Sequence, residues 1–161
     1  MKKNKGITLI SLIVTILVLM IIAGISVYSG KEIIKEAKLE GLRTNMLLIQ
    51  AKAKEYVEQA SFKMGPEPVD AERKENVRQE VYGGVGLEKA TGITVPSEIP
   101  ISECYKVTTN TLKLWGLDKI DLEEGEYYLI KFDETNNTAE IYNTLGINGK
   151  YSLTEIETIE E

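Results

Sequence analysis

A run of 24 uncharged residues at positions 7–30 constrains this chain more than any other feature of its sequence. The run consists mainly of Ile, Leu and Val, and it follows a short start that contains three lysines. As an α-helix it would be about 36 Å long, whereas the hydrocarbon core of a bilayer is about 30 Å thick. Because backbone groups in lipid must bond to one another, a single span can only be helical. The sequence therefore predicts a transmembrane helix at residues 7–30.

Three interpretations of this start compete. A secretory signal peptide has an apolar region of about 7–15 residues and a small-residue cleavage site. The run here is longer, although Val27-Tyr28-Ser29 would serve as such a site. A plain membrane anchor would keep Met1 and would never be cleaved. In the third interpretation the chain is cleaved at Gly6, on the cytoplasmic side of the apolar run.

The segment Lys5-Gly6-Ile7-Thr8-Leu9-Ile10, followed by a long apolar helix, resembles the class III signal of type IV pilins and type II secretion pseudopilins. In that family a prepilin peptidase cleaves after the glycine and methylates the new amino terminus. The resemblance implies cleavage between Gly6 and Ile7 and N-methylation of Ile7. It also implies that a membrane assembly platform packs the helix against other pilin or pseudopilin subunits. The residues expected to carry this assembly are Leu9, Ile10, Ser11, Ile13, Leu17 and Ile21.

Two positions depart from the family pattern. The family usually has Phe or Met directly after the glycine, where this chain has Ile7. It usually has Glu at the fifth position after the cleavage site, where this chain has Ser11. That glutamate is thought to pair with the amino terminus of a neighbouring subunit, and some minor pseudopilins at the filament tip lack it. Ser11 therefore favours a minor or atypical subunit.

From Lys31 the pattern becomes amphipathic without a break. Apolar residues recur at gaps of three to five, which predicts a helix over residues 31–64 with one face in the core. The predicted core face comprises Ile34, Ala37, Leu42, Met46, Ile49, Ala53, Val57 and Ala60. Gly65-Pro66 should end this helix. We expect three segments: a leader at 1–6, an assembly helix at 7–30 and an extracytoplasmic domain at 31–161.

The rest of the chain predicts short helices and a small sheet. Asp70 can cap a short helix over residues 71–82, and a second short helix should begin at Thr109 or Asn110. Alternating apolar residues predict a β-hairpin over residues 127–143. Residues 87–101 are expected to be irregular because Pro96 and Pro100 interrupt any ladder, and the tail at 154–161 is expected to be frayed. The predicted fold class is α+β, with a long amino-terminal helix covered by a small carboxy-terminal antiparallel sheet, as in the pilin fold.

The residue types argue against catalysis. The chain contains no histidine, which is the commonest general base and metal ligand. The carboxylate pairs Asp118/Asp121 and Glu123/Glu124 have the spacing of a solvated loop. We therefore expect no enzymatic activity, no cofactor and no metal site. Oxygen ligands for calcium occur at residues 133–137, but they lack the number and spacing of a dedicated calcium loop, and the sequence favours a turn there. The oxygen-bearing residues are Asp133, Glu134, Asn136 and Asn137.

The net charge and the single residues Cys104 and Trp115 limit the kinds of partner and contact that we expect. The net charge is −6, and loss of the leader would remove three lysines. Because nucleic-acid binding depends on basic patches, we expect no nucleic-acid partner. Cys104 is the only cysteine, so it cannot form an internal disulfide and is expected to be a buried thiol. Trp115 is expected to be a core aromatic rather than a binding anchor.

Two functions remain open on the sequence alone. The first is a structural subunit of a type IV pilus-like or type II secretion-like filament. It would be a single-pass membrane protein with its carboxy-terminal domain outside, and it would reach the cell surface or pilus after assembly. The second is a static single-pass membrane-anchored surface binding protein. The sequence does not distinguish among adhesion, twitching, secretion and DNA uptake as the task of such a filament. It also does not distinguish a major from a minor subunit.

Overall fold

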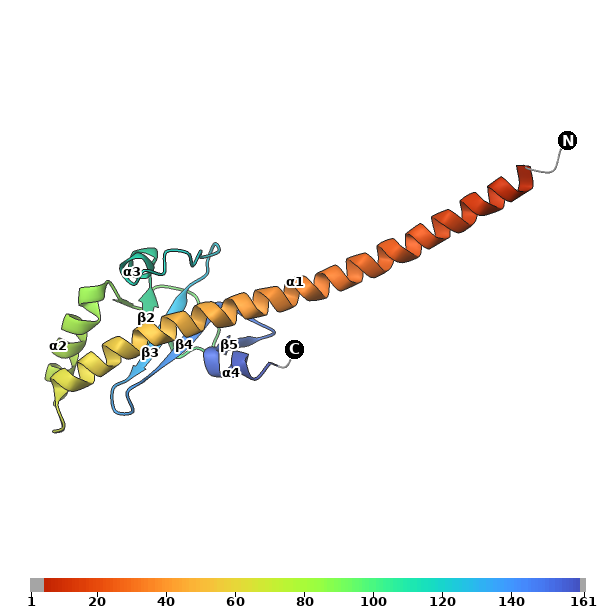
Figure 1. Cartoon of the computed structure of the whole chain (residues 1–161). Helices are drawn as coiled ribbons and strands as arrows, with labels where there is room; N and C mark the ends of the chain where they lie inside the picture. Colours follow the sequence, from red (N-terminus) through yellow and green to blue (C-terminus); the bar gives the residue numbers. More distant parts are fainter. Residues whose placement is uncertain (1–4, 160–161) are drawn as a thin grey trace. The chain divides into compact units, whose positions relative to one another are not determined.

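A computed structural model describes the backbone of residues 5–159 and the side chains in that range except those of residues 5–11 and 22–31 (Figure 1). The chain divides into two compact units, one that ends at Glu40 and one that comprises Gly41–Glu161. The helix α1 (Lys5–Met64) contributes to both. In the first unit Ile34 and Ala37 are exposed, so the predicted core face is wrong at these two positions.

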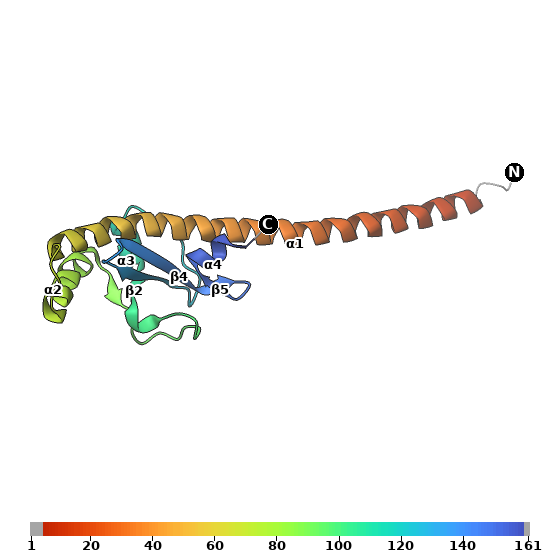
Figure 2. The same ribbon diagram turned by 90° about the horizontal axis from the view of Figure 1, so that it is seen from below.

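In the second unit α1 packs one face against the sheet (Figure 2). The side chains on this face follow the helical period and are buried. They are Met46, Ile49, Ala53, Val57, Ala60 and Met64. The helix ends where Gly65 adopts a φ of +79° and donates its N–H to the carbonyl oxygen of Ser61 at 3.0 Å. Glycine tolerates this left-handed backbone at no steric cost, and Pro66 cannot continue the helix.

The sheet is antiparallel and has five strands in sequential order. The strands are β1 (Glu88–Lys89), β2 (Cys104–Val107), β3 (Tyr128–Asp133), β4 (Thr138–Ile147) and β5 (Lys150–Ser152). Tyr105 lies opposite Ile130, which in turn lies opposite Ile141, so these apolar side chains share one face of the sheet. The α+β fold class is therefore confirmed, with a long helix and an antiparallel sheet carboxy-terminal to it.

Each face of the sheet is covered. On the side of α1, Asn45 donates to the hydroxyl of Tyr128 at 3.4 Å. On the other side, Cys104 and Leu129 form a small core with Ala90 and Ile99 from the connection between β1 and β2. Both sheet faces therefore bury apolar side chains, and the connection from Ala90 to Glu103 acts as a covering layer.

The short helices lie close to where local sequence predicts them. The helix α2 (Ala71–Val81) is capped by Asp70, whose side chain accepts from the N–H of Arg73 at 2.7 Å. The helix α3 (Thr109–Leu114) is capped by Thr108, and Gly116, which has a φ of +70°, follows its carboxy-terminal cap Trp115. Two 3₁₀ turns, η1 (Gly83–Val85) and η2 (Ile101–Glu103), precede β1 and β2.

Two expectations about the rest of the chain are wrong. The stretch predicted to be irregular contains β1, because Glu88 and Lys89 pair with β2. The tail predicted to be frayed instead forms α4 (Leu153–Glu157), capped by Ser152. The Arg43 guanidinium on α1 donates to the carbonyl oxygens of Ile156 at 3.4 Å and Ile159 at 3.2 Å. These bonds and the burial of the Ile156 side chain hold the tail in place up to residue 159.

Candidate functional site

The described part of the first unit is dominated by an apolar helical segment at residues 12–21. Nine of its ten side chains are large and hydrophobic, and each of these is between 44% and 67% exposed. Thr15 is the remaining residue, and the segment contains no charge. A helix that is apolar on all sides is stable only in apolar surroundings. The chain alone does not supply these surroundings to the described segment.

The predicted site residues fall partly within this segment. Ile13, Leu17 and Ile21 are all exposed, and their spacing of four places them along one side of α1. The other predicted residues lie on the helical backbone of α1, but their side chains are outside the described residues. They are Gly6, Ile7, Leu9, Ile10 and Ser11.

The predicted membrane span at 7–30 likewise includes side chains outside the described set. Among the described residues, no helix carries a stretch of enough length and hydrophobicity to cross a bilayer.

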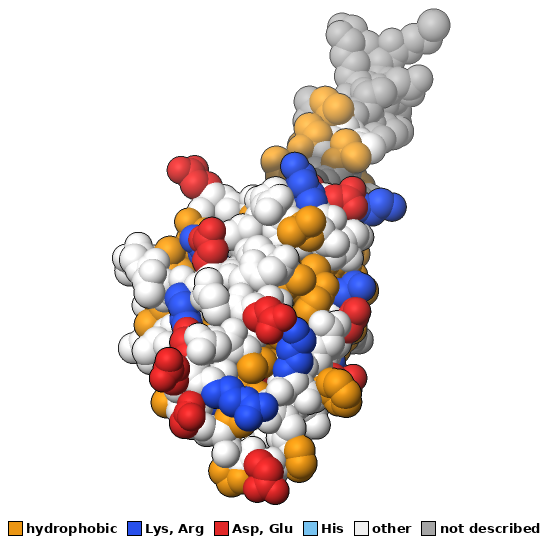
Figure 3. All heavy atoms as spheres, turned by 90° about the vertical axis from the view of Figure 1, so that its left-hand side faces the viewer, with side chains coloured by type: hydrophobic (Ala, Val, Ile, Leu, Met, Phe, Trp, Pro, Cys, Tyr) orange, Lys and Arg blue, Asp and Glu red, His pale blue; other side chains and the backbone are white. Residues whose placement is uncertain are grey.

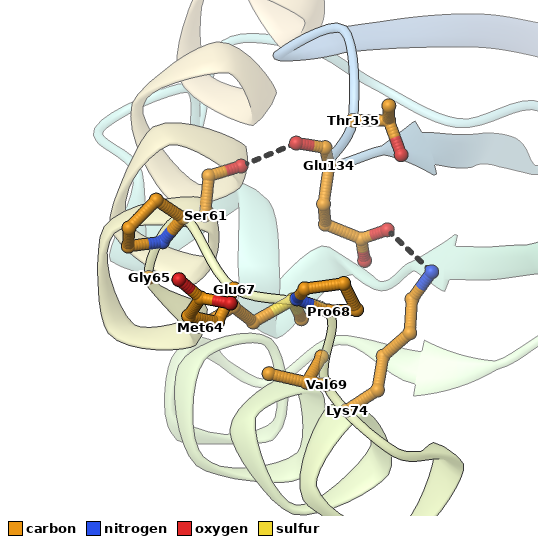
Figure 4. A pocket seen from close by; sticks show the side chains of 10 residues that line it. Ser61, Met64, Gly65, Glu67, Pro68, Val69, Lys74, Glu134 and Thr135 are labelled. Atoms are coloured by element: carbon orange, nitrogen blue, oxygen red, sulfur yellow. Dashed lines mark hydrogen bonds and ion pairs between the residues drawn. The ribbon is translucent and has the colours of Figure 1, made fainter.

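A cleft in the second unit is a further candidate site (Figure 4). It has a volume of about 570 Å³ and lies between the end of α1, the loop at residues 65–69, the start of α2 and the β3–β4 turn. Its walls combine apolar side chains with the polar groups of Ser61, Glu67, Lys74, Glu134 and Thr135. The apolar lining residues are Met64, Pro66, Pro68 and Val69. This volume lies within the range of about 300–1,000 Å³ that small-molecule pockets occupy, but Gly65, Pro66, Glu67 and Pro68 in its wall are exposed.

Glu134 forms one wall of the cleft and is the centre of a buried ionic network. Glu134 is 8% exposed. Its carboxylate accepts two hydrogen bonds from Arg78 and one from the Tyr82 hydroxyl at 3.1 Å. The Lys74 ammonium lies 3.6 Å from the same carboxylate. The Ser61 hydroxyl donates to the Glu134 backbone carbonyl at 2.7 Å. The network therefore joins α1 and α2 to the β3–β4 turn.

The network also decides which of these groups are charged. Burial raises the pKa of the Glu134 carboxyl, but the hydrogen bonds and positive charge of Arg78 outweigh burial, and the net pKa is lowered. Burial and the neighbouring carboxylate raise the pKa of the Tyr82 hydroxyl. Glu134 is therefore an anion at neutral pH, and Tyr82 stays protonated and donates to it.

The turn at residues 133–137 does not gather its oxygens around a cation. The Asp133 carboxylate accepts from the N–H groups of Thr135 at 3.0 Å and Asn136 at 3.1 Å, which closes the turn. The Glu134 carboxylate instead accepts a hydrogen bond from Arg78. Within residues that the structure describes, no group of three or more Asp, Glu or Cys side chains is placed to hold a metal ion.

The remaining residues singled out by sequence lie in the core or in solvent. Trp115 is 5% exposed and stacks on Tyr56 with ring centroids 5.5 Å apart, so the prediction of a core aromatic is confirmed. Cys104 is buried as predicted, and burial raises the pKa of its thiol to about 11. The four carboxylate residues considered for catalysis are exposed. These are Asp118, Asp121, Glu123 and Glu124.

Charge on the surface is mixed where Figure 3 displays it. On that face acidic and basic side chains are interspersed with hydrophobic ones, and neither sign gathers into a patch. This face therefore presents no concentrated positive charge of the kind that attracts a nucleic-acid backbone.

The cleft was missed by sequence reasoning. Its walls come from residues 61–69 and Lys74, which are close in the chain, and from residues 134–135, which follow Lys74 by 60 positions. The one local signal is the Gly65-Pro66 helix end, which predicts the loop but not what the loop encloses.

Comparison with known proteins identifies the start of the chain. Residues 1–27 match the family model of the prokaryotic N-terminal methylation motif. This motif is the signal of type IV pilins and pseudopilins, as the resemblance at Lys5–Ile10 suggested. The matched residues include the predicted cleavage position and most of the apolar run. No curated protein and no solved structure shows significant similarity to the chain.

Proposed function

We propose that this chain is a structural subunit of a type IV pilus-like or type II secretion-like filament. The observation that carries the proposal is the exposed apolar segment at residues 12–21, which lies inside the part of the chain that matches the methylation motif. The motif supports a pilin-like assembly subunit, and the exposed segment supplies a surface that such an assembly would cover.

The proposed mechanism begins in the membrane. The helix over residues 7–30 is inserted with the lysine-bearing leader on the cytoplasmic side. A prepilin peptidase cleaves between Gly6 and Ile7 and methylates the new amino terminus of Ile7. Ser11 leaves the segment without the usual intramembrane glutamate, and this lowers the free energy of holding the segment in lipid.

Assembly then exchanges lipid for protein around the same side chains. Exposing a Val, Leu, Ile or Met side chain to water costs about 1.5–3 kcal/mol, so the nine described side chains keep the segment out of water at every stage. Helices associate in lipid through close packing rather than through the hydrophobic effect. An assembly platform therefore moves the subunit from one apolar environment to another, with the domain at 31–161 on the extracytoplasmic side of the membrane.

A processing experiment tests this proposal. The full chain is produced with and without a prepilin peptidase, and mass spectrometry of the intact protein determines its amino terminus. The expected product with the peptidase begins at N-methylated Ile7. Gly6→Val should block cleavage, whereas Gly41→Ala, in the same helix, should be cleaved normally.

The other interpretations predict different products. An intact Met1 in the presence of the peptidase would contradict the proposal and favour the static membrane-anchored binding protein. An amino terminus just after Ser29 would favour a secretory signal peptide. Because Trp115 is buried, the contact surface of a static binding protein would not include it.

A further inference from the structure

The turn between β3 and β4 carries a sequence motif for the attachment of a sugar. Asn136-Asn137-Thr138 has the pattern Asn-x-Thr with a middle residue other than proline, which is the acceptor pattern of N-linked glycosylation. Asn136 is the one asparagine in the sequence that is followed two positions later by serine or threonine. Its neighbour Asn137 is followed at that distance by Ala139. Since so short a motif also occurs by chance, its structural context decides whether it can act.

The structure exposes the whole motif. Asn136, Asn137 and Thr138 are all exposed, and the turn projects from the end of the β3–β4 hairpin (Figure 1). Asn143, farther along β4, is only 1% exposed and donates its amide to Glu126. A modifying enzyme and a hydrated saccharide both need a surface turn. Position 136 meets this requirement.

The amide group of Asn136 is held only by neighbours within the turn. Its Nδ2 donates to Oδ2 of Asp133 at 2.6 Å, and its backbone N–H donates to Oδ1 of the same carboxylate at 3.1 Å. These bonds lie at the surface, where water can replace them, so their net contribution to stability is small. The Asn136 side chain can therefore leave Asp133 and enter an enzyme while the buried strands stay paired.

We propose that Asn136 is an acceptor for N-linked glycosylation and that the donor is an oligosaccharide carried on a lipid diphosphate. In the transfer, Nδ2 of Asn136 forms a bond to C1 of the first sugar. The bond from C1 to the diphosphate oxygen breaks, and the lipid diphosphate leaves with that electron pair. The amide nitrogen loses one proton to a base of the transferase. The Thr138 hydroxyl, which can both donate and accept a hydrogen bond, is the group by which the transferase recognises this asparagine.

This inference rests on one part of the proposed function, which puts the domain at 31–161 on the extracytoplasmic side of the membrane. N-linked glycosylation marks surface loops of secreted proteins, so a domain that stayed in the cytoplasm would not carry it. Cleavage after Gly6 and assembly into a filament are not required. The two proposals can therefore fail separately.

Mass spectrometry of the full chain from the membranes of its source organism tests the proposal. Trypsin cleaves after Lys131 and Lys150, and the sequence between them contains no other lysine or arginine. Fragmentation of the peptide 132–150 by electron transfer keeps a sugar on its residue, so it distinguishes Asn136 from Asn137 and from the threonine hydroxyls. The expected result is a saccharide mass on Asn136. Sugar on another residue of the peptide would overturn the proposal.

Variants produced in the same organism test the motif. Asn136→Gln and Thr138→Ala should lose the added mass, whereas Thr138→Ser and Asn137→Gln should keep it. All of these changes are at exposed positions, and the retained pair controls for disturbance of the turn. Retention of the sugar in Thr138→Ala, or its loss from all four variants, would show that the motif is not what is recognised and would overturn the proposal.

The amino terminus of the same sample separates this inference from the function on which it rests. If the chain begins at N-methylated Ile7 and Asn136 is unmodified, the glycosylation proposal is overturned and the filament proposal stands. If Met1 is intact and Asn136 carries a saccharide, the filament proposal is overturned and the glycosylation proposal stands. An intact Met1 together with an unmodified Asn136 overturns both.

Discussion

Arg78 donates two hydrogen bonds to Glu134, from Nε to Oε1 at 2.6 Å and from Nη2 to Oε2 at 2.9 Å, across 56 positions of sequence. This bidentate arrangement fixes both the distance and the angle between α2 and the β3–β4 turn. The carboxylate is buried while the arginine is partly exposed, so the pair stabilises the fold chiefly by satisfying a charge that solvent does not reach.

We expect Glu134→Gln to lower the free energy of unfolding of the Gly41–Glu161 unit by about 2–3 kcal/mol. The substitution keeps the shape of the side chain but leaves Arg78 and Lys74 without their shared counter-charge. Chemical denaturation of the full chain in detergent, followed by tryptophan fluorescence of Trp115, measures the change. Glu124→Gln, at an exposed position, is the control and should shift stability by less than about 0.5 kcal/mol. Equal effects of the two variants would contradict the prediction.

The same pair predicts how stability depends on pH. The pKa of Glu134 is lowered in the folded chain, so the folded state binds this proton less readily than the unfolded state does. The contribution of Glu134 is therefore complete above the ordinary glutamate pKa of about 4.3 and is lost as the pH falls through the lower folded value. Denaturation at a series of pH values should show that the difference between the native chain and Glu134→Gln shrinks below that point. A constant difference over the acidic range would exclude this linkage.

Gly146 should tolerate no side chain. Its φ is +58°, and an added Cβ would lie 2.3 Å from the Lys150 carbonyl oxygen and 2.5 Å from a ring carbon of Tyr151. We expect Gly146→Ala to lower the free energy of unfolding by more than about 2 kcal/mol, since β5 must shift. Gly92→Ala is the matched control, because Gly92 has a φ of +75° and its Cβ would meet nothing within 4 Å. Its expected cost is the backbone strain alone, about 1–2 kcal/mol. Thermal unfolding measures both, and similar losses would show that the contact with β5 is unimportant.

The apolar segment provides a prediction about assembly. Leu17→Arg places a charge at the middle of residues 12–21, and a charge in the centre of a membrane helix costs about 2.5–3.5 kcal/mol. We expect the variant to be recovered poorly in membranes and absent from sheared filaments, whereas Leu17→Met should behave as the native chain. Quantitative immunoblotting of the membrane and filament fractions measures this. Normal recovery of Leu17→Arg in filaments would show that this side of the helix faces solvent.

The functional signal of this chain is contiguous, and this is why it can be recognised without a structure. Gly6, Ile7 and the apolar run follow one another in the sequence, and the match to the methylation motif at residues 1–27 covers most of this stretch. The cleft is the opposite case. Met64, Lys74 and Glu134 line the same cleft only after α1, α2 and the β3–β4 turn have packed together. No local sequence pattern therefore predicts the cleft.

Elements with strong local preferences were determined by the sequence itself. Asp70 caps α2, Gly65-Pro66 ends α1, and the turn after Asp133 joins the β3–β4 hairpin, because capping, helix breaking and turn formation depend on neighbouring residues. Only the tertiary structure decided the pairing of β2 with β3, the contact of Arg43 with the tail and the partner of Glu134. Arg43 holds the tail from 113 positions away, and interactions over such distances are selected by the packing of the whole unit rather than by local preference.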